Sequence, residues 1–264
     1  MFDHNLFNKE LSTSWLGREL FYYPELSSTN DHAKKIINES SLHGSLIVAD
    51  HQTAGKGQHQ RKWDAEPGQN LTFSIIFEPQ KGERLSILTL ACALAVCEYI
   101  DENLPETAWL KWPNDVLIGG KKVSGLLTET VFKGDKLERL VIGIGVNINQ
   151  QTFENELANS ATSFSLLDKN THQRELVLAR LLTRIEYFYR LWSTQNSYLI
   201  KRINSKLIGY GKWIRLEVDG REVNGEFKLL GINESGHLLV LNKELEVNTF
   251  SYEQVRVRFD SKTS

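Results

Sequence analysis

The chain has 264 residues, of which 41% are hydrophobic and 24% are charged, the proportions of a globular protein with a substantial core. Its 31 basic and 33 acidic residues leave a net charge of −2, which gives no general attraction to nucleic acid or to an anionic membrane. Residues 1–15 lack the pattern of a signal peptide, and no apolar run is long enough to span a bilayer. We therefore expect a cytoplasmic protein without a membrane partner.

The larger part of the chain, residues 1–203, mixes helix and strand patterns. The segment 1–15 is expected to be a loose arm or a short helix. In chain order the patterns then predict a strand at 18–23, a short capped helix at 27–37, strands at 45–49 and 70–77, a helix at 85–100, strands at 109–112, 116–118, 122–132 and 137–147, and one long helix from 174 to about 203.

The character of the sequence changes near Asn204. From Trp213 to Val257, short alternating strands are separated by turns at 219–220, 224–225 and 235–236. This pattern predicts a small all-β domain at 204–264, which follows an α+β domain at 1–203.

The two cysteines do not indicate catalysis. Cys92 and Cys97 lie in the apolar run from Ile87 to Ile100, where buried packing is the expected use of a thiol. The histidines are scattered without metal-ligand spacing. Chemistry must therefore be sought in the polar and glycine-rich segments.

The first such segment is the glycine-containing stretch 52–63. Gly55 and Gly57 let the backbone approach a ligand closely, and Lys56, Arg61 and Lys62 supply the positive charge that suits a phosphate. A solvated surface loop would have a similar composition, so this loop taken alone does not decide the function.

The second segment reads Lys-Trp-Pro-Asn-Asp at 111–115. Pro113 interrupts a strand-like run and forces an irregular backbone. Lys111, Asn114 and Asp115 are then presented at a strand end, where polar groups can converge on a ligand. An ordinary turn is the alternative interpretation.

Two further segments contain glycines at strand positions. Lys122 begins a strand shortly before Gly125 and could hold an anion, although a lysine pair at a hairpin is also a common protection of a sheet edge. Gly143 and Gly145 interrupt an apolar strand, which usually marks the close approach of a ligand or of another backbone. Asn147 follows them as a polar group able to meet a phosphate.

Together and in this order, the segments resemble the catalytic domain of the biotin protein ligases. The matching stretches are Ser-Thr-Asn at 28–30, the loop 52–63, Lys-Trp-Pro-Asn-Asp at 111–115, Gly-Lys-Lys-Val-Ser-Gly-Leu-Leu at 120–127 and Gly-Ile-Gly-Val-Asn-Ile-Asn at 143–149. The resemblance continues through 204–258. It implies a mixed, largely antiparallel sheet with packed helices, followed by a small SH3-like β-barrel.

The resemblance also implies an activity. Biotin would be activated by ATP, with Mg²⁺, to biotinyl-5′-AMP and then transferred to a specific lysine of a biotin carboxyl carrier protein. A lipoate or octanoate ligase or transferase of the same architecture is the alternative. Longer members carry an amino-terminal DNA-binding domain, for which the residues before the first predicted strand leave no room, so we expect no DNA partner. Both a monomer and a homodimer fit the sequence.

Residue roles follow from the same resemblance. Biotin-binding residues would be Ser28, Thr29, Asn30, Gln52, Gly55, Lys56, Gly57, Lys122 and Gly125. Nucleotide-binding residues would be Lys56, Gln58, Arg61, Trp63, Asn114 and Asn147, with Asn147 also near the metal. Lys122, Lys111 and Asp115 would serve the chemistry, Asp115 as proton acceptor or orienting group. The family loop often reads Gly-Arg-Gly-Arg-x-Gly-Arg, whereas this chain has the neutral Gln58 at the second arginine position.

Overall fold

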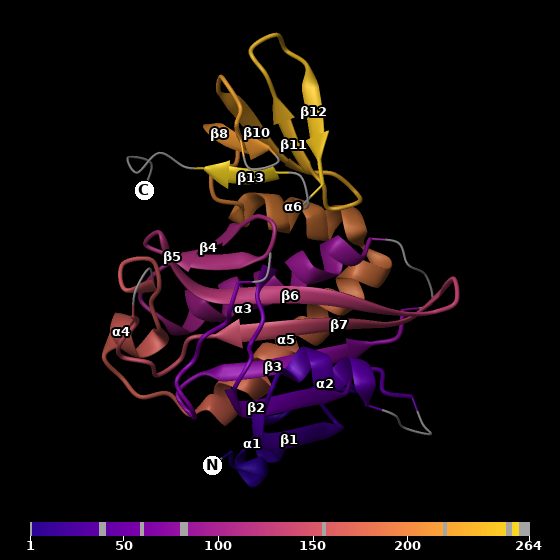
Figure 1. The fold of residues 1–264 in the computed structure, drawn as a ribbon, viewed down its shortest axis with the longest axis vertical. Coiled ribbons are helices and arrows are strands. Elements are labelled where there is room, and N and C mark those ends of the chain that lie inside the picture. The colour runs from indigo at the N-terminus through magenta and orange to yellow at the C-terminus, as the bar shows by residue number, and fades with distance from the viewer. Residues whose placement is uncertain are drawn as a thin grey trace.

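The computed structural model describes residues 2–36, 41–58, 61–79, 84–154, 157–218, 221–251 and 255–258. Its larger part is built on one seven-stranded sheet (Figure 1). The strand order is β1 (Leu20–Leu26), β2 (Leu46–Gln52), β3 (Leu71–Phe77), β7 (Lys136–Val146), β6 (Lys121–Lys133), β5 (Asp115–Ile118) and β4 (Ala108–Lys111). The β1–β2 pair is parallel and the other neighbours are antiparallel. The predicted mixed, largely antiparallel sheet is confirmed.

Helices cover both faces of this sheet. Every position of β3 is buried, because the long helices α3 (Leu85–Asn103) and α5 (Arg174–Thr194) lie behind the sheet and the short α2 (Thr29–Lys35) lies in front of it (Figure 1). The helix α3 packs against α5 on one side and the strands on the other, which explains why it is apolar all round. Burial raises the pKa of its Cys92 thiol to about 12, as expected for a packing residue.

One helical expectation is confirmed and another needs correction. Of the two alternatives for 1–15, the short helix is the correct one: α1 (His4–Glu10) packs on α5 and buries Phe7. The single helix expected over 174–203 is wrong: α5 ends at Thr194 and α6 (Asn196–Lys206) follows it. Gln195 between them has a non-helical backbone, with φ −137° and ψ 53°. Apolar periodicity continues across this break, so the pattern did not reveal it. A further short helix, α4 (Phe164–Asp168), was not expected.

The carboxyl-terminal strands form the predicted small β domain, which lies above the large sheet in Figure 1. Its antiparallel sheet, consistent with an SH3-like half-barrel, has the order β12 (Val247–Phe250), β11 (Leu238–Leu241), β10 (Phe227–Ile232), β8 (Trp213–Val218) and β13 (Val255–Arg258), with β9 (Arg221–Glu222) paired to β8. The turns expected at 224–225 and 235–236 separate these strands. The turn expected at 219–220 lies outside the described residues.

The two parts of the chain are bonded to each other. The Trp112 indole N–H donates to the Gly236 carbonyl at 3.1 Å, and the Asn204 side chain accepts from the Ile232 backbone N–H at 2.9 Å. Residue 204 lies within α6, and the boundary placed there from the sequence stays a prediction. Among the described helices, none combines the length and apolarity needed to cross a bilayer.

A turn of the amino-terminal segment is held by one carboxylate of α5. Glu186 accepts hydrogen bonds from the backbone N–H groups of Ser14, Trp15 and Leu16, at 2.8 to 3.0 Å. Burial alone would raise the pKa of Glu186, but these three hydrogen bonds hold it below the usual value. Because the pKa is lowered by folding, the charged carboxylate stabilises the fold at neutral pH, and this contribution is lost as the pH falls through the folded-state pKa.

We therefore predict that Glu186→Gln lowers the free energy of unfolding by about 1–3 kcal/mol at pH 7. The difference from the unmodified protein should shrink below a pH of about 4, where the carboxyl group is protonated in the unfolded chain. Urea unfolding at several pH values measures this difference in the free energy of unfolding. Glu138→Gln, an exposed change on β7, is the control. A pH-independent difference would show that the carboxylate charge is not what holds the turn.

Candidate active site

The register of the sheet places the residues singled out in the strands in a single row. Asp115 is the cross-strand partner of Gly125, and Gly125 is the partner of Gly145. Lys111 continues the row on one side and Thr72 on the other. Residues that lie opposite each other in neighbouring strands project from the same face. This face therefore carries a lysine and an aspartate beside two positions that have no side chain.

A β-bulge brings Lys122 to the same face. The pairing of β5 and β6 is regular at Val116 and Ser124, but Leu117 pairs with Lys122, so that Val123 is an extra residue. In a regular strand, positions 122 and 125 would point to opposite faces. The extra residue reverses the direction of Lys122. The sequence left open whether Lys122 points inward or protects a sheet edge, and it carried no signal for the bulge that turns Lys122 inward.

The ammonium group of Lys122 lies between an acid and bare backbone. Its Nζ atom is 2.6 Å from Oδ1 of Asp115, although the contact lacks hydrogen-bond geometry. A Cβ atom on Gly125 would come within 2.8 Å of the same Nζ. The two charged side chains are 34% and 24% exposed, so solvent can still reach the pair. For Lys111, the described part of the chain records no ion pair.

Trp63 fills the space over the paired glycines. A Cβ atom on Gly145 would lie 2.2 Å from the indole ring, and one on Gly125 would lie 3.2 Å from it. Lys122 Nζ lies 5.7 Å from the ring centroid. The indole Nε1 is buried and has no hydrogen-bond partner among the described residues. The glycine pattern predicted a ligand or another backbone at this place, and the structure shows an aromatic side chain there.

A second glycine contact fixes the segment 28–30. A Cβ atom on Gly143 would lie 2.3 Å from Oδ1 of Asn30. The Asn30 amide donates to the Leu127 carbonyl at 3.1 Å and to Glu129 at 2.9 Å, and it accepts from Ser74 at 2.6 Å. Asn30 is therefore held from three strands of the sheet.

Thr29 is held by a side chain of β2, and Ser28 is held by the first turn of α2. Gln52 Oε1 accepts from the Thr29 backbone N–H at 2.7 Å and from its hydroxyl at 3.0 Å. Ser28 is the N-cap of α2, where its hydroxyl accepts from the Asp31 N–H. The segment therefore forms a rigid polar corner at the start of α2.

The two asparagines of the predicted nucleotide site are also tied to the backbone. Asn114 Nδ2 donates to the Leu126 carbonyl, and Asn147 Nδ2 donates to the Thr162 carbonyl at 3.0 Å. With their amide nitrogens committed, each side chain has its oxygen left for further partners. Among the residues that the structure describes, no group of three His, Cys, Asp or Glu side chains is placed to bind a metal.

The glycine-containing loop folds back on itself. The Trp63 N–H donates to the Gly55 carbonyl at 3.0 Å, and the Gly57 N–H donates to the Arg61 carbonyl at 2.7 Å. Lys56 reaches away from this hairpin, and its Nζ atom lies 2.6 Å from Oδ2 of Asp31 on α2. Positions 59 and 60 of the loop lie outside the described residues.

All of these elements meet in one cavity of about 1810 Å³. Of the site residues expected from the sequence, all but Gly55 line it: Ser28, Thr29, Asn30, Gln52, Lys56, Gly57, Gln58, Arg61, Trp63, Lys111, Asn114, Asp115, Lys122, Gly125 and Asn147. The volume exceeds the several hundred Å³ of a usual small-molecule pocket, so it has room for two substrates side by side.

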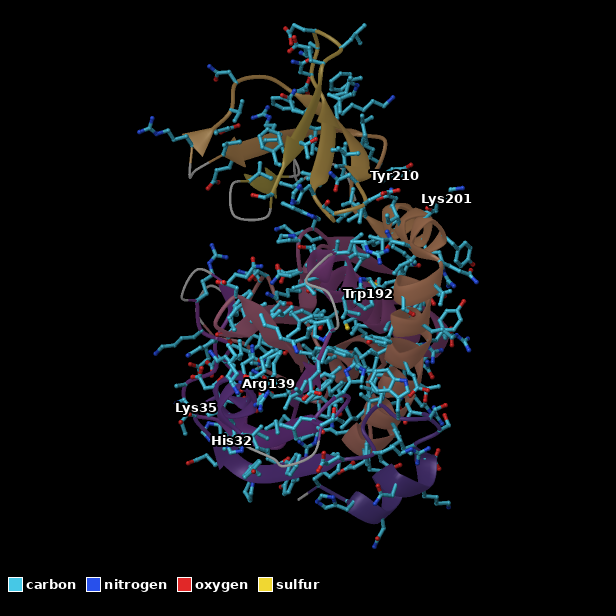
Figure 2. All side chains as sticks on the ribbon, turned by 90° about the vertical axis from the view of Figure 1, so that its right-hand side faces the viewer. His32, Lys35, Arg139, Trp192, Lys201 and Tyr210 are labelled. Atoms are coloured by element: carbon cyan, nitrogen blue, oxygen red, sulfur yellow. The ribbon has the colours of Figure 1, made fainter. Side chains whose placement is uncertain are left out.

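Part of the cavity wall was not anticipated. Phe153 and Leu157 line it from the segment before α4, and Tyr210 and Trp213 line it from the start of the small domain. Figure 2 shows Tyr210 at the junction of the two parts, far from His32 and Lys35 of α2. Nothing in the local sequence marks these residues as site residues. Phe153 and Leu157 reach the cavity because the segment before α4 lies beside β6, and Tyr210 and Trp213 reach it because the small domain packs on the sheet.

The comparisons with known proteins agree on one family. A model of the biotin/lipoate A/B protein ligase family matches residues 22–147. The bifunctional ligase/repressor BirA of Bacillus subtilis is 38% identical over 240 residues, which cover 89% of this chain and 73% of that protein. The chain belongs to the biotin protein ligase family.

Other members of the biotin protein ligase family support this placement. The biotin–[acetyl-CoA-carboxylase] ligase of Mycobacterium tuberculosis is 29% identical over 215 residues, which cover 77% of this chain and 76% of that protein. The solved structure of the Aquifex aeolicus biotin protein ligase with biotin and ATP has a TM-score of 0.80 and 30% identity, over 92% of this chain and all of that one. The resemblance noted in the sequence and the fold that it implied are both confirmed.

For this biotin protein ligase family member, the contact between Trp63 and Gly145 predicts an energetic coupling. Gly145→Ala should lower the free energy of unfolding by about 1–3 kcal/mol, because the added Cβ overlaps the indole ring. In a Trp63→Ala background the same change should cost little. Urea unfolding of the four proteins gives the coupling energy. An equal cost in both backgrounds would show that the indole ring does not constrain position 145.

Proposed function

We propose that the chain is a biotin–[biotin carboxyl carrier protein] ligase. It converts biotin and ATP to biotinyl-5′-AMP and transfers the biotinyl group to one lysine of a carboxylase carrier domain. The observation that carries the proposal is the row of Lys111, Asp115 and Gly125 with Lys122 beside it, facing one large cavity. Relatives named as ligases for acetyl-CoA carboxylase support the choice of carrier.

The first step brings two anions together. An oxygen of the biotin carboxylate attacks the α-phosphorus of ATP, and the bond to pyrophosphate breaks. Cations fixed in advance around the reacting atoms stabilise the charge that develops there. Lys122 is suited to this role, because its ammonium group lies beside Gly125 and Trp63 and lines the cavity. Lys111 and Arg61 are the further proposed cations.

The second step is attack by the carrier lysine on the mixed anhydride. The new amide bond forms as AMP leaves, and the attacking amine must first lose a proton, since its reference pKa is about 10.4. We assign this proton to Asp115 as acceptor or, through its contact with Lys122, as orienting group. Trp63 and the loop around it would exclude water, which otherwise hydrolyses the anhydride.

Magnesium enters this proposal as part of the substrate MgATP. Mg²⁺ usually keeps several waters and is held by substrate phosphates together with one or two protein oxygens. Asn147 would offer one such oxygen, since its amide nitrogen is bonded to Thr162. The proposal does not extend to DNA, toward which a net charge of −2 gives no electrostatic drive.

Lipoate or octanoate transfer is the second candidate, because the matching family model covers both groups of enzymes. Members that use a cysteine nucleophile need a thiol that substrate can reach and that ionises readily. Cys92 and Cys97 are both buried in α3, and burial raises the pKa of both thiols. These residues do not favour a cysteine-dependent transferase.

Exchange of labelled pyrophosphate into ATP tests the proposed function directly. Exchange should appear with biotin and remain at background with lipoate or octanoate. Exchange that depends on lipoate or octanoate and not on biotin would overturn the proposal. With a carrier protein present, biotin should become attached to a lysine, as detected by mass spectrometry.

Lys122→Ala should slow biotin-dependent pyrophosphate exchange by about 10²–10³-fold, the usual cost of removing one preorganised charge at a transition state. The matched control is Lys121→Ala, which removes the adjacent exposed lysine at the hairpin. Equal, small effects of the two changes would favour edge protection as the purpose of this lysine pair and would remove Lys122 from the mechanism.

The loop 53–62 should respond to the product of the first step. Its many polar residues and two glycines give it little apolar surface to bury, which is typical of the least stable parts of a protein. Amide hydrogen exchange across 53–62 should slow when biotinyl-5′-AMP is added. If the exchange rates are equal with and without this ligand, the loop is not a cover for the adenylate.

A further inference from the structure

A chain of alternating charges runs from the glycine-containing loop through α2 to β6. Asp31 Oδ2 lies 2.6 Å from Lys56 Nζ, and Asp31 Oδ1 lies 3.0 Å from Lys34 Nζ. Lys34 also pairs with Glu129 on β6, and the second oxygen of Glu129 accepts from Asn30 at 2.9 Å. Asp31 therefore links the glycine-containing loop to the segment that would contact biotin.

The Lys56–Asp31 pair is important because the residues on either side of Lys56 have no side chains that could hold the loop. Lys56 stands between Gly55 and Gly57, which have no side chains to contact the body of the protein. The loop is bonded at its start, where the Ala54 N–H donates to the Ser27 carbonyl at 2.9 Å, and it is packed at its end through Trp63. In the part of the loop between, the Lys56–Asp31 pair is the recorded link to α2.

We propose that Asp31 is a positioning residue of the ligase reaction, which holds Lys56 and thereby fastens the middle of the loop against α2 beside the biotin segment. This inference rests on the proposed function and deepens it. In this proposal Lys56 holds the loop in place through Asp31, and other cations bind the phosphate of the ligand. Asp31 itself touches neither substrate, and its effect passes through the position of the loop.

The charge and exposure of the Lys56–Asp31 pair suit a contact that can break and form again. Burial alone would raise the pKa of Asp31, but the hydrogen bonds from Lys56 and Lys34 hold it below its usual value, so the carboxylate is charged at neutral pH. The Lys56 side chain is 47% exposed and that of Asp31 is 24% exposed. A pair exposed to this degree is screened by salt and is individually weak. The pair can hold the loop near α2 and still release it in each catalytic cycle.

Hydrogen exchange of the protein without substrates tests the fastening itself. Asp31→Asn, Lys56→Met and the double variant should each raise exchange at residues 53–58 by about two- to fivefold, the ratio expected for one exposed ion pair. Exchange in the double variant should be no faster than in either single variant, because both substitutions remove the same ion pair. Lys62→Met, which removes a neighbouring exposed lysine of the same loop, is the control. Unchanged exchange in Asp31→Asn, or an equal rise in Lys62→Met, would overturn the inference.

The rate of biotinyl-5′-AMP release tests its consequence for the reaction. Asp31→Asn should release the adenylate about two- to fivefold faster, and the difference from the unmodified protein should vanish between about 0.1 and 1 M salt, because salt screens the pair. A purely structural role of Asp31 would leave a difference that salt does not remove, which would overturn the inference.

Pyrophosphate exchange separates the two possible uses of Lys56. If Lys56→Met slows exchange by about 10²-fold while Asp31→Asn does not, Lys56 is a phosphate ligand and the inference fails. Similar and small effects of the two changes support it. Absence of any biotin-dependent exchange in the unmodified protein would instead contradict the proposed function, and the hydrogen-exchange result without substrates would still decide whether Asp31 fastens the loop.

Discussion

Two neighbouring strands of the large sheet lack a side chain at the same level, and the rest of the site is arranged around that gap. Gly125 of β6 faces Gly145 of β7, so a patch of bare backbone opens on the face toward the cavity. The Trp63 ring lies on this patch, and the Lys122 ammonium lies at its edge. Two residues along β7, Gly143 leaves the corresponding space for Asn30. The loop, α2 and Lys122 thus all contact positions of the sheet that carry no side chain.

Two amines of the cavity are held by carboxylates, one from the sheet and one from α2. Asp115 holds Lys122, and Asp31 holds Lys56. Each carboxylate reduces the freedom of a long flexible side chain before any ligand binds, so less reorganisation is needed when charge develops. The two pairs differ in what they orient. Lys122 belongs to a strand, whereas Lys56 belongs to a loop, so the same type of contact fixes a side chain of the sheet in one case and a connecting segment in the other.

The sequence predicted the strands and α3 well, because long apolar runs and glycine–proline punctuation are local signals. It also predicted polar groups at a strand end near 111–115, since Pro113 marks the irregular backbone between β4, which ends at Lys111, and β5, which begins at Asp115. It did not predict Asp31 as a partner of the loop, because a charged residue in the first turn of a helix is ordinary on local grounds. The bulge at Val123 and the break at Gln195 were equally hidden, since neither interrupts the apolar pattern.

Trp112 has a consequence for the way the molecule unfolds. Its ring is 4% exposed, and its N–H is bonded to the Gly236 carbonyl of the small domain. Asn204 of α6 packs against Gly231 of that domain, where a Cβ atom would come within 2.6 Å of it. Separating the small domain from the sheet would expose the indole to water and break its hydrogen bond. We therefore expect the two parts to unfold together, with changes in the small domain also felt at the strand ends that carry Lys111 and Asp115.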